Sequence, residues 1–130
     1  MKRVLVLLLC LGLCGCYTLA NFRTDNRRNL LKLSIGMMKQ EVLNIMGNKY
    51  AEDGIITANN PYRSEILQGK DKTFEVLYYY TDIKNFDAWR GMKGIADDEL
   101  TPLVFDNGKL IGWGQSFLQD NIQKYEIRVR

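Results

Sequence analysis

The chain has 130 residues, of which 46% are hydrophobic, 25% are charged and two are proline. This length fits one domain, and the composition excludes a disordered, collagen-like or solenoid protein. There is no histidine, so the most common general base and metal ligand at neutral pH is missing. The cysteines (Cys10, Cys14 and Cys16) all lie near the N-terminus, so they cannot crosslink a domain that follows them.

The N-terminus has the pattern of a secretory signal peptide. A basic start, Met1-Lys2-Arg3, precedes an apolar run over 4–13. This run is about half the roughly 20 residues that a membrane-spanning helix needs. A signal peptide that is cut elsewhere and a hydrophobic helix that is kept as an anchor remain alternatives. Loss of Lys2 and Arg3 lowers the formal net charge of +3 by two, so nothing indicates a nucleic-acid partner.

The end of the apolar run, Leu13-Cys14-Gly15-Cys16, resembles the bacterial lipobox. The resemblance implies that Cys16 is acylated and becomes the first residue of the mature chain, and two or more acyl chains anchor a protein stably. Tyr17 follows instead of Asp, which by the sorting rule of enteric bacteria implies the outer membrane. We therefore expect a signal peptide over 1–15, a lipidated tether over 16–25 and a single domain over 26–130.

Two short helices are predicted at the start of this domain. Apolar residues recur at helical spacing in Leu30, Leu31 and Leu33 and again in Met38, Val42, Ile45 and Met46. Thr24 or Asp25 would cap a first helix over 26–33, and Gly47 would end a second helix over 38–46. Helices of this length are marginal alone, so the pair needs a sheet to pack on.

The rest of the chain is predicted to supply the sheet. Strands are expected over 62–67, 73–81, 100–105 and 109–113. Asn107-Gly108 is typical of a type I′ hairpin turn. In the second strand, Tyr78 and Tyr80 share one face, while Leu77 and Tyr79 share the other.

The remaining segments are less regular. We expect a loop over 82–99, a short helix or irregular return over 115–124 and a last strand over 125–129. The fold class is therefore α+β, with an N-terminal helical hairpin packed on an antiparallel β-sheet of three to five strands.

No arrangement of residues indicates catalysis. The serines (Ser34, Ser64 and Ser116) have neither a histidine nor a lysine three residues on. Asp97-Asp98-Glu99 lacks the spacing of a calcium loop and favours a solvated acidic loop. We expect no catalytic residue, no metal and no cofactor.

Aromatic side chains are the informative surplus. If helices cover one face of the sheet, the other face carries Tyr79 toward solvent or a partner. Trp, Tyr and Arg anchor many protein interfaces. The candidate partner-binding residues are therefore Tyr79, Trp89, Arg90, Trp113 and Phe117. The alternative is that both tryptophans fill the ends of the core.

Several motifs together resemble the SmpA/OmlA (BamE-like) family of small outer-membrane lipoproteins. They are the lipobox, the segment 36–47 (GMMKQEVLNIMG), a tyrosine-rich strand and the segment 104–110 (VFDNGKL). The resemblance covers about 26–113. Met38 stands where that family has Thr or Ser, and no Pro follows Gly47 closely, which points to an uncharacterised branch.

The resemblance implies a helix-on-sheet fold and a role in outer-membrane protein assembly or envelope integrity. We expect a non-enzymatic lipoprotein that faces the periplasm and binds an envelope protein, with the β-barrel assembly machinery as the candidate partner. The alternative is a module that binds a small ligand or anionic lipid headgroups, in which Arg27, Arg28 and Lys32 on the first helix would meet the membrane.

Overall fold

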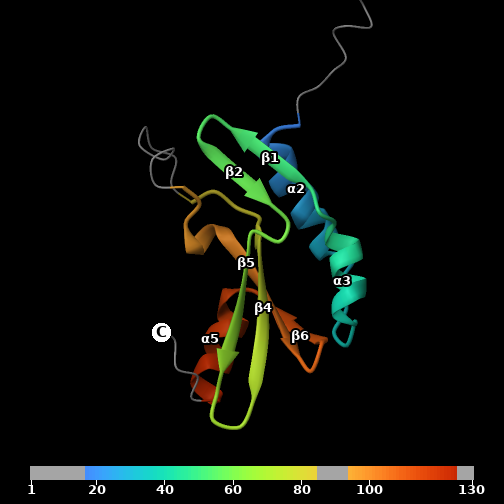
Figure 1. Cartoon of the computed structure of the whole chain (residues 1–130), viewed down its shortest axis with the longest axis vertical. Coiled ribbons are helices and arrows are strands. Elements are labelled where there is room, and N and C mark those ends of the chain that lie inside the picture. The colour runs from blue at the N-terminus through green and yellow to red at the C-terminus, as the bar shows by residue number, and fades with distance from the viewer. Residues whose placement is uncertain (1–16, 85–93, 126–130) are drawn as a thin grey trace, which may run out of the picture.

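Helices and antiparallel strands follow one another as the α+β prediction requires. The computed structural model describes residues 17–84 and 94–125 (Figure 1). The elements are α2 (Leu19–Leu30), α3 (Lys39–Met46), β1 (Tyr50–Asp53), β2 (Ile56–Asn59), β3 (Arg63–Gln68), β4 (Thr73–Tyr80), the 3₁₀-helix η1 (Asp97–Glu99), β5 (Leu100–Asp106), β6 (Lys109–Trp113) and α5 (Gln115–Lys124). Of the predicted last strand over 125–129, all but Tyr125 lies outside the described residues.

Four consecutive strands form an antiparallel sheet in the order β3-β4-β5-β6. The turn between β5 and β6 places Asn107 at φ 51° and Gly108 at φ 74°, the left-handed pair that a type I′ turn needs. Strands β1 and β2, which were not predicted from the sequence, pair with each other as a separate hairpin beside α2 (Figure 1).

Both faces of the four-stranded sheet are covered. On one face, α3 packs on a cluster that we call the closed face: Leu77, Tyr79, Leu103, Phe105 and Leu110. On the other, α2, the β1–β2 hairpin and α5 pack on a cluster that we call the groove face: Phe74, Val76, Tyr78, Tyr80, Leu100 and Val104. The expectation that helices cover only one face is therefore wrong. The segment 115–124, left open as helix or return, is the helix that adds the second cover.

The first helix begins earlier than predicted. Thr18 caps α2 by accepting a hydrogen bond from the backbone of Asn21 at 3.3 Å, and Leu19 and Phe22 are buried in the core. Residues 19–25, expected in the tether, therefore belong to the folded domain. The apolar stripe was missed because its next position, Asn26, is a buried polar residue.

Asn26 and Asn60 form a reciprocal pair of buried amides. Nδ2 of Asn26 donates to Oδ1 of Asn60 (3.0 Å) and to the carbonyl oxygen of Tyr80 (2.8 Å). Nδ2 of Asn60 donates to Oδ1 of Asn26 (2.7 Å) and to the carbonyl oxygen of Met46 (3.1 Å). These bonds join α2 to the end of β4 and to the end of α3, and they satisfy polar groups that burial would otherwise penalise.

The second helix agrees with its prediction. It runs over Lys39–Met46 and ends at Gly47, whose φ of 71° suits a residue without a Cβ. Met38 occupies the N-cap position but offers no side-chain cap. The carboxylate of Glu41 instead accepts a hydrogen bond from the backbone nitrogen of Met38 at 2.8 Å.

The acidic run near the end of the predicted loop divides into two environments. Asp97 and Asp98 are exposed, as expected of a solvated loop. Glu99 is buried, and its carboxylate accepts hydrogen bonds from the backbone nitrogens of Lys84 and Ala96, both at 3.0 Å. A solvated role is therefore wrong for Glu99, which fastens two backbone segments to the start of β5.

Candidate functional site

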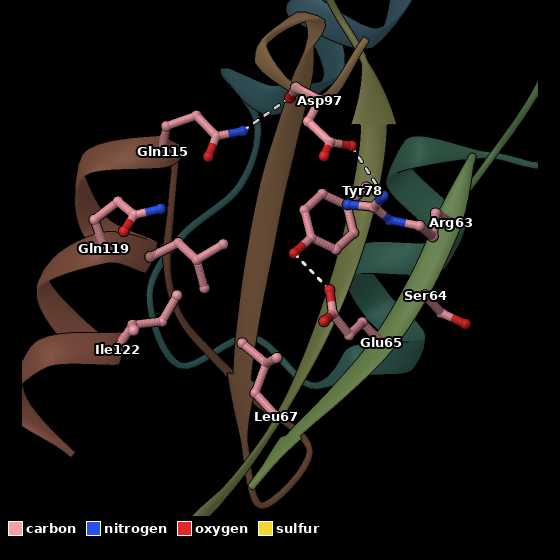
Figure 2. A pocket seen from close by; sticks show the side chains of 10 residues that line it. Arg63, Ser64, Glu65, Leu67, Tyr78, Asp97, Gln115, Gln119 and Ile122 are labelled. Carbon is pink, nitrogen blue, oxygen red and sulfur yellow. Dashed lines mark hydrogen bonds and ion pairs between the residues drawn. The ribbon is translucent and has the colours of Figure 1, made fainter. Parts of the chain in front are cut away.

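A groove of about 500 Å³ lies on the groove face between β3 and α5 (Figure 2). Because α5 packs against β5 and β6, it leaves the part of this face nearest β3 uncovered. Strand β3 and helix α5 supply most of the lining, and the residues are Arg63, Ser64, Glu65, Leu67, Tyr78, Asp97, Gln115, Leu118, Gln119 and Ile122.

One end of the groove carries an ion pair stacked on an aromatic ring. Nη1 of Arg63 lies 2.9 Å from Oδ1 of Asp97. The guanidinium carbon of Arg63 lies 4.2 Å from the centre of the Tyr78 ring. The side chain of Arg63 is 42% exposed and that of Asp97 is 78% exposed, so the pair adds little to stability and mainly fixes the direction of the guanidinium.

Glu65 places a carboxylate inside the groove without an ion-pair partner among the described residues. Its Oε2 accepts a hydrogen bond from the hydroxyl of Tyr78 at 2.8 Å (Figure 2). Burial and this hydrogen bond raise the pKa of Tyr78 to about 12, so the tyrosine is a neutral partner. Among residues 17–84 and 94–125, Glu65 forms no ion pair, because the one arginine in the groove is paired with Asp97.

The middle and the far end of the groove are apolar. Leu67 and Leu118 are buried beside it, and Ile122 is partly buried against the same core cluster. The near end of α5 is fixed by Gln115, whose Nε2 donates to the carbonyl oxygens of Asp97 (3.0 Å) and Leu100 (3.1 Å). The groove thus has a charged end, an apolar bed and two walls tied to the same sheet.

The two edges of the four-stranded sheet differ. Residues 36–39 run along the outer edge of β6, where the backbone nitrogens of Gly36 and Lys39 donate to Leu110 and Gly108, each at 2.8 Å. Leu110 returns a bond to the carbonyl oxygen of Met37, also at 2.8 Å. In the part of the chain that the structure describes, no strand pairs with the outer edge of β3.

The hydrogen-bond pattern shows which backbone groups of β3 point outward. At the β3–β4 turn, the backbone nitrogen of Gly69 donates to the carbonyl oxygen of Lys72 at 2.8 Å, which marks a hydrogen-bonded pair. Such pairs alternate along an antiparallel ladder. With the register Gln68↔Thr73, the backbone groups of Ser64, Ile66 and Gln68 therefore face away from β4.

The structure does not gather the predicted partner-binding residues on one surface. Tyr79 is fully buried on the closed face, so its assignment to an exposed interface is wrong. Trp113 is partly buried against the closed face, whereas Phe117 is partly buried against the groove face. Trp89 and Arg90, like the proposed lipidation site Cys16, lie outside the described residues.

The basic residues of the headgroup alternative have partners within the domain. Arg27 donates to the carbonyl oxygen of Thr81 at 2.7 Å, Arg28 lies 3.5 Å from Asp25, and Lys32 donates to Asn29 at 2.9 Å. Arg27 and Arg28 lie in the last turn of α2. At 1.5 Å per residue, this turn is about 12 Å along the axis from the end of the helix that would be nearest a membrane anchor.

Sequence reasoning missed the residues of the groove. Arg63, Glu65 and Leu67 alternate along β3 and therefore share one face, a pattern that the sequence does contain. Charges that point inward from a strand are one sign of a sheet edge. That signal becomes informative only when β3 is known to be an edge strand and α5 is known to form the opposite wall.

The described residues, 17–84 and 94–125, contain neither a cluster of metal ligands nor a membrane-spanning helix. No three acidic or cysteine side chains there come together in a way that would hold a metal ion. No helix of this part of the chain is long and apolar enough to cross a membrane.

A protein-family model matches most of the chain. The model of a family described as "Protein of unknown function (DUF3192)" matches residues 19–120. The match begins at the first residue of α2 and ends inside α5, so it includes β3 and the first six residues of α5 but not Ile122. Comparisons with curated proteins and with solved structures gave no match.

Proposed function

The chain belongs to the DUF3192 family, and we propose that it is a non-enzymatic lipoprotein of the bacterial envelope that binds a protein partner through the groove between β3 and α5. The observation that carries the proposal is the open side of the sheet. Within the described part of the chain, the outer edge of β3 is unpaired, and it adjoins a groove with a charged end and an apolar bed. This combination suits the recognition of a polypeptide.

The proposed anchor is Cys16, acylated after removal of 1–15, and the proposed location is the periplasmic side of the outer membrane. Helix α2 begins at Leu19, so only Tyr17 and Thr18 separate this cysteine from the folded domain. Such a link reaches about 10 Å when fully extended. The domain would therefore stay against the membrane, where its partner would be an envelope protein. The resemblance to SmpA/OmlA proteins directs the search first to the β-barrel assembly machinery.

The anchor is tested by the intact mass of the protein from the membrane fraction, with Cys16→Ala beside it. We expect a mature chain that begins at Cys16 and carries acyl mass, and we expect the variant to lack this mass. An unacylated chain in the membrane fraction would contradict the lipoprotein assignment.

The partner site is tested by photo-crosslinking in cells. A photoreactive residue is placed at Gln119, an exposed position of α5 that lines the groove, and, as the control, at Gln40, an exposed position of α3 over the closed face. We expect one envelope protein, identified by mass spectrometry, to crosslink at Gln119 and not at Gln40, and to bind the full chain again after separate purification. Equal crosslinking at both positions would contradict the groove as the binding site.

A further inference from the structure

The open edge of β3 offers hydrogen-bonding groups in a regular row. The backbone groups of Ser64, Ile66 and Gln68 point outward, at the spacing with which one strand receives another. Ile66 is 64% exposed, an unusual position for a large apolar side chain on a strand edge. A strand paired here would satisfy the row and cover Ile66 on the face opposite the groove.

Charge distinguishes the kind of strand that fits. A paired strand places a side chain directly opposite each side chain of β3, on the same face of the sheet. Opposite Glu65 this side chain would meet a carboxylate with no cationic partner in the described residues. Opposite Leu67 it would meet the apolar bed formed with Leu118 and Ile122 (Figure 2). A basic residue satisfies the first position and an apolar residue the second.

From this juxtaposition we propose that the partner supplies an extended segment that pairs antiparallel with β3 as an additional strand. The segment presents an apolar residue to Leu67, an apolar residue to Ile66 and a lysine or arginine to Glu65, in that order along its chain. This inference rests on the proposed function, because it specifies how the same site holds a protein partner. It adds the recognition mode and the chemistry of the recognised segment.

The probe is a fluorescein-labelled peptide of the sequence Thr-Val-Val-Lys-Thr with blocked ends, titrated against the full chain in detergent. A peptide with Glu in place of Lys is the control for charge. We expect the lysine peptide to bind at least about tenfold more tightly, since the control sets two carboxylates against each other. Equal binding of the two peptides would overturn the proposed charge recognition.

Two matched glutamate variants locate the charge. Glu65→Gln should lower the affinity for the lysine peptide about tenfold. Glu52→Gln removes the same charge from another strand glutamate that also accepts a hydrogen bond from a tyrosine hydroxyl, that of Tyr50, but lies on the β1–β2 hairpin away from the groove. This control should leave the affinity unchanged. Equal weakening by both variants would overturn the assignment to Glu65.

Two variants of Ile66 test backbone pairing. Ile66→Pro deletes an outward N–H without removing a bond to β4, whereas Ile66→Thr keeps that N–H. We expect the proline variant to lose peptide binding and the threonine variant to stay within about threefold of the wild type. A melting curve of the proline variant shows whether the domain still folds. If the proline variant does not fold, the test is made by NMR on the wild type. The backbone amide chemical shifts of Ser64, Ile66 and Gln68 should change when the peptide is added. Unchanged shifts there would overturn strand addition.

The outcomes separate this inference from the proposed function. Crosslinking at Gln119 that persists in Ile66→Pro, together with no binding of the lysine peptide, would overturn strand addition and leave partner binding intact. Tight, charge-dependent peptide binding without any crosslinked protein in cells would support strand addition and contradict the proposed cellular role. A wild-type dimer that Ile66→Pro dissolves would assign the edge to a second copy of this chain and overturn the proposal.

Discussion

Tyr78 and Tyr79 are neighbours on β4, yet the two faces of the sheet treat them in opposite ways. The Tyr78 ring lies under Arg63 and its hydroxyl donates to Glu65 at the groove. The Tyr79 hydroxyl is fully buried under α3 and has no hydrogen-bond partner among the described residues. The closed face therefore serves packing even at the expense of a polar group, whereas the groove face keeps polar groups that can be reached from outside. Chemically identical side chains therefore differ in their polar partners according to what covers them.

The largest expected effect compares the stability contributed by the helices that cover the two faces of the sheet. Met46→Ala on α3 should lower the free energy of unfolding by about 3 kcal/mol, because Met46 is fully buried against the closed face. Ile122→Ala on α5 should cost only about 1 kcal/mol, because Ile122 is partly exposed beside the groove. Urea denaturation measures both values. Equal losses would show that the groove wall is packed as tightly as the closed face.

The next effect concerns the part of the groove face that α5 covers, over β6. A Cβ on Gly112 of β6 would lie about 2.5 Å from the ring of Phe117 on α5, so Gly112→Ala must displace that ring. The expected loss is about 2 kcal/mol. Phe117→Leu in the same chain should recover part of it. Strictly additive losses in this double-mutant cycle would mean that the ring does not seal β6.

A smaller effect contrasts the tyrosines themselves. Tyr79→Phe should raise the free energy of unfolding by about 1 kcal/mol, since it removes a buried hydroxyl without a partner. Tyr78→Phe should lower it by a similar or smaller amount, since it removes the hydrogen bond to Glu65. Opposite signs at neutral pH are the expected result of urea denaturation, and equal signs would contradict the division between the faces.

The same tyrosines give a dependence on pH. Burial raises the pKa of Tyr79 to about 12, whereas a tyrosine in the unfolded chain titrates near 10. The folded state keeps its proton where the unfolded state loses it, so the stability is complete below pH 10 and falls between about pH 10 and pH 12. Thermal melts across this range should show a shallower fall for Tyr79→Phe. A slope that matches that of the wild type would place the hydroxyl in contact with water.

The smallest expected effect is a gain in stability at α3, the helix that covers the closed face. Met38 caps α3 without a side-chain hydrogen bond. Met38→Thr supplies an acceptor at this position and should add about 0.5 kcal/mol. Thermal denaturation measures the gain, and Met38→Val, which has a similar shape but no hydroxyl, is the control. A gain that Val reproduces would come from shape or propensity and not from capping.

Local chemistry made much of the fold predictable. The Asn107-Gly108 turn, the division of the β4 side chains between two faces and the end of α3 at Gly47 depend on a few neighbouring residues, and all three are confirmed. The start of α2 was missed because Asn26 is buried by partners 34 or more residues away, and no periodicity of apolar residues shows this.

The candidate site was much less predictable. Tyr79 was assigned to an interface because a strand pattern distinguishes two faces but does not say whether both are covered. Whether the second face is covered depends on α5, and the position of α5 is determined by its packing on the whole sheet. Glu65 and Arg63 were overlooked because charges on a short strand acquire meaning only once the strand is known to be an edge.

The reciprocal amides of Asn26 and Asn60 have a consequence for how the family changes over time. Each amide is both donor and acceptor for the other. Replacing one asparagine therefore leaves buried polar groups of the other without partners. Replacing both by apolar residues leaves mainly two backbone carbonyls without a hydrogen bond. Mutations at the two positions are therefore strongly non-additive. We therefore expect the two positions to change together in evolution. Members of the family should keep both asparagines or replace both, and sequences with a single asparagine should be rare.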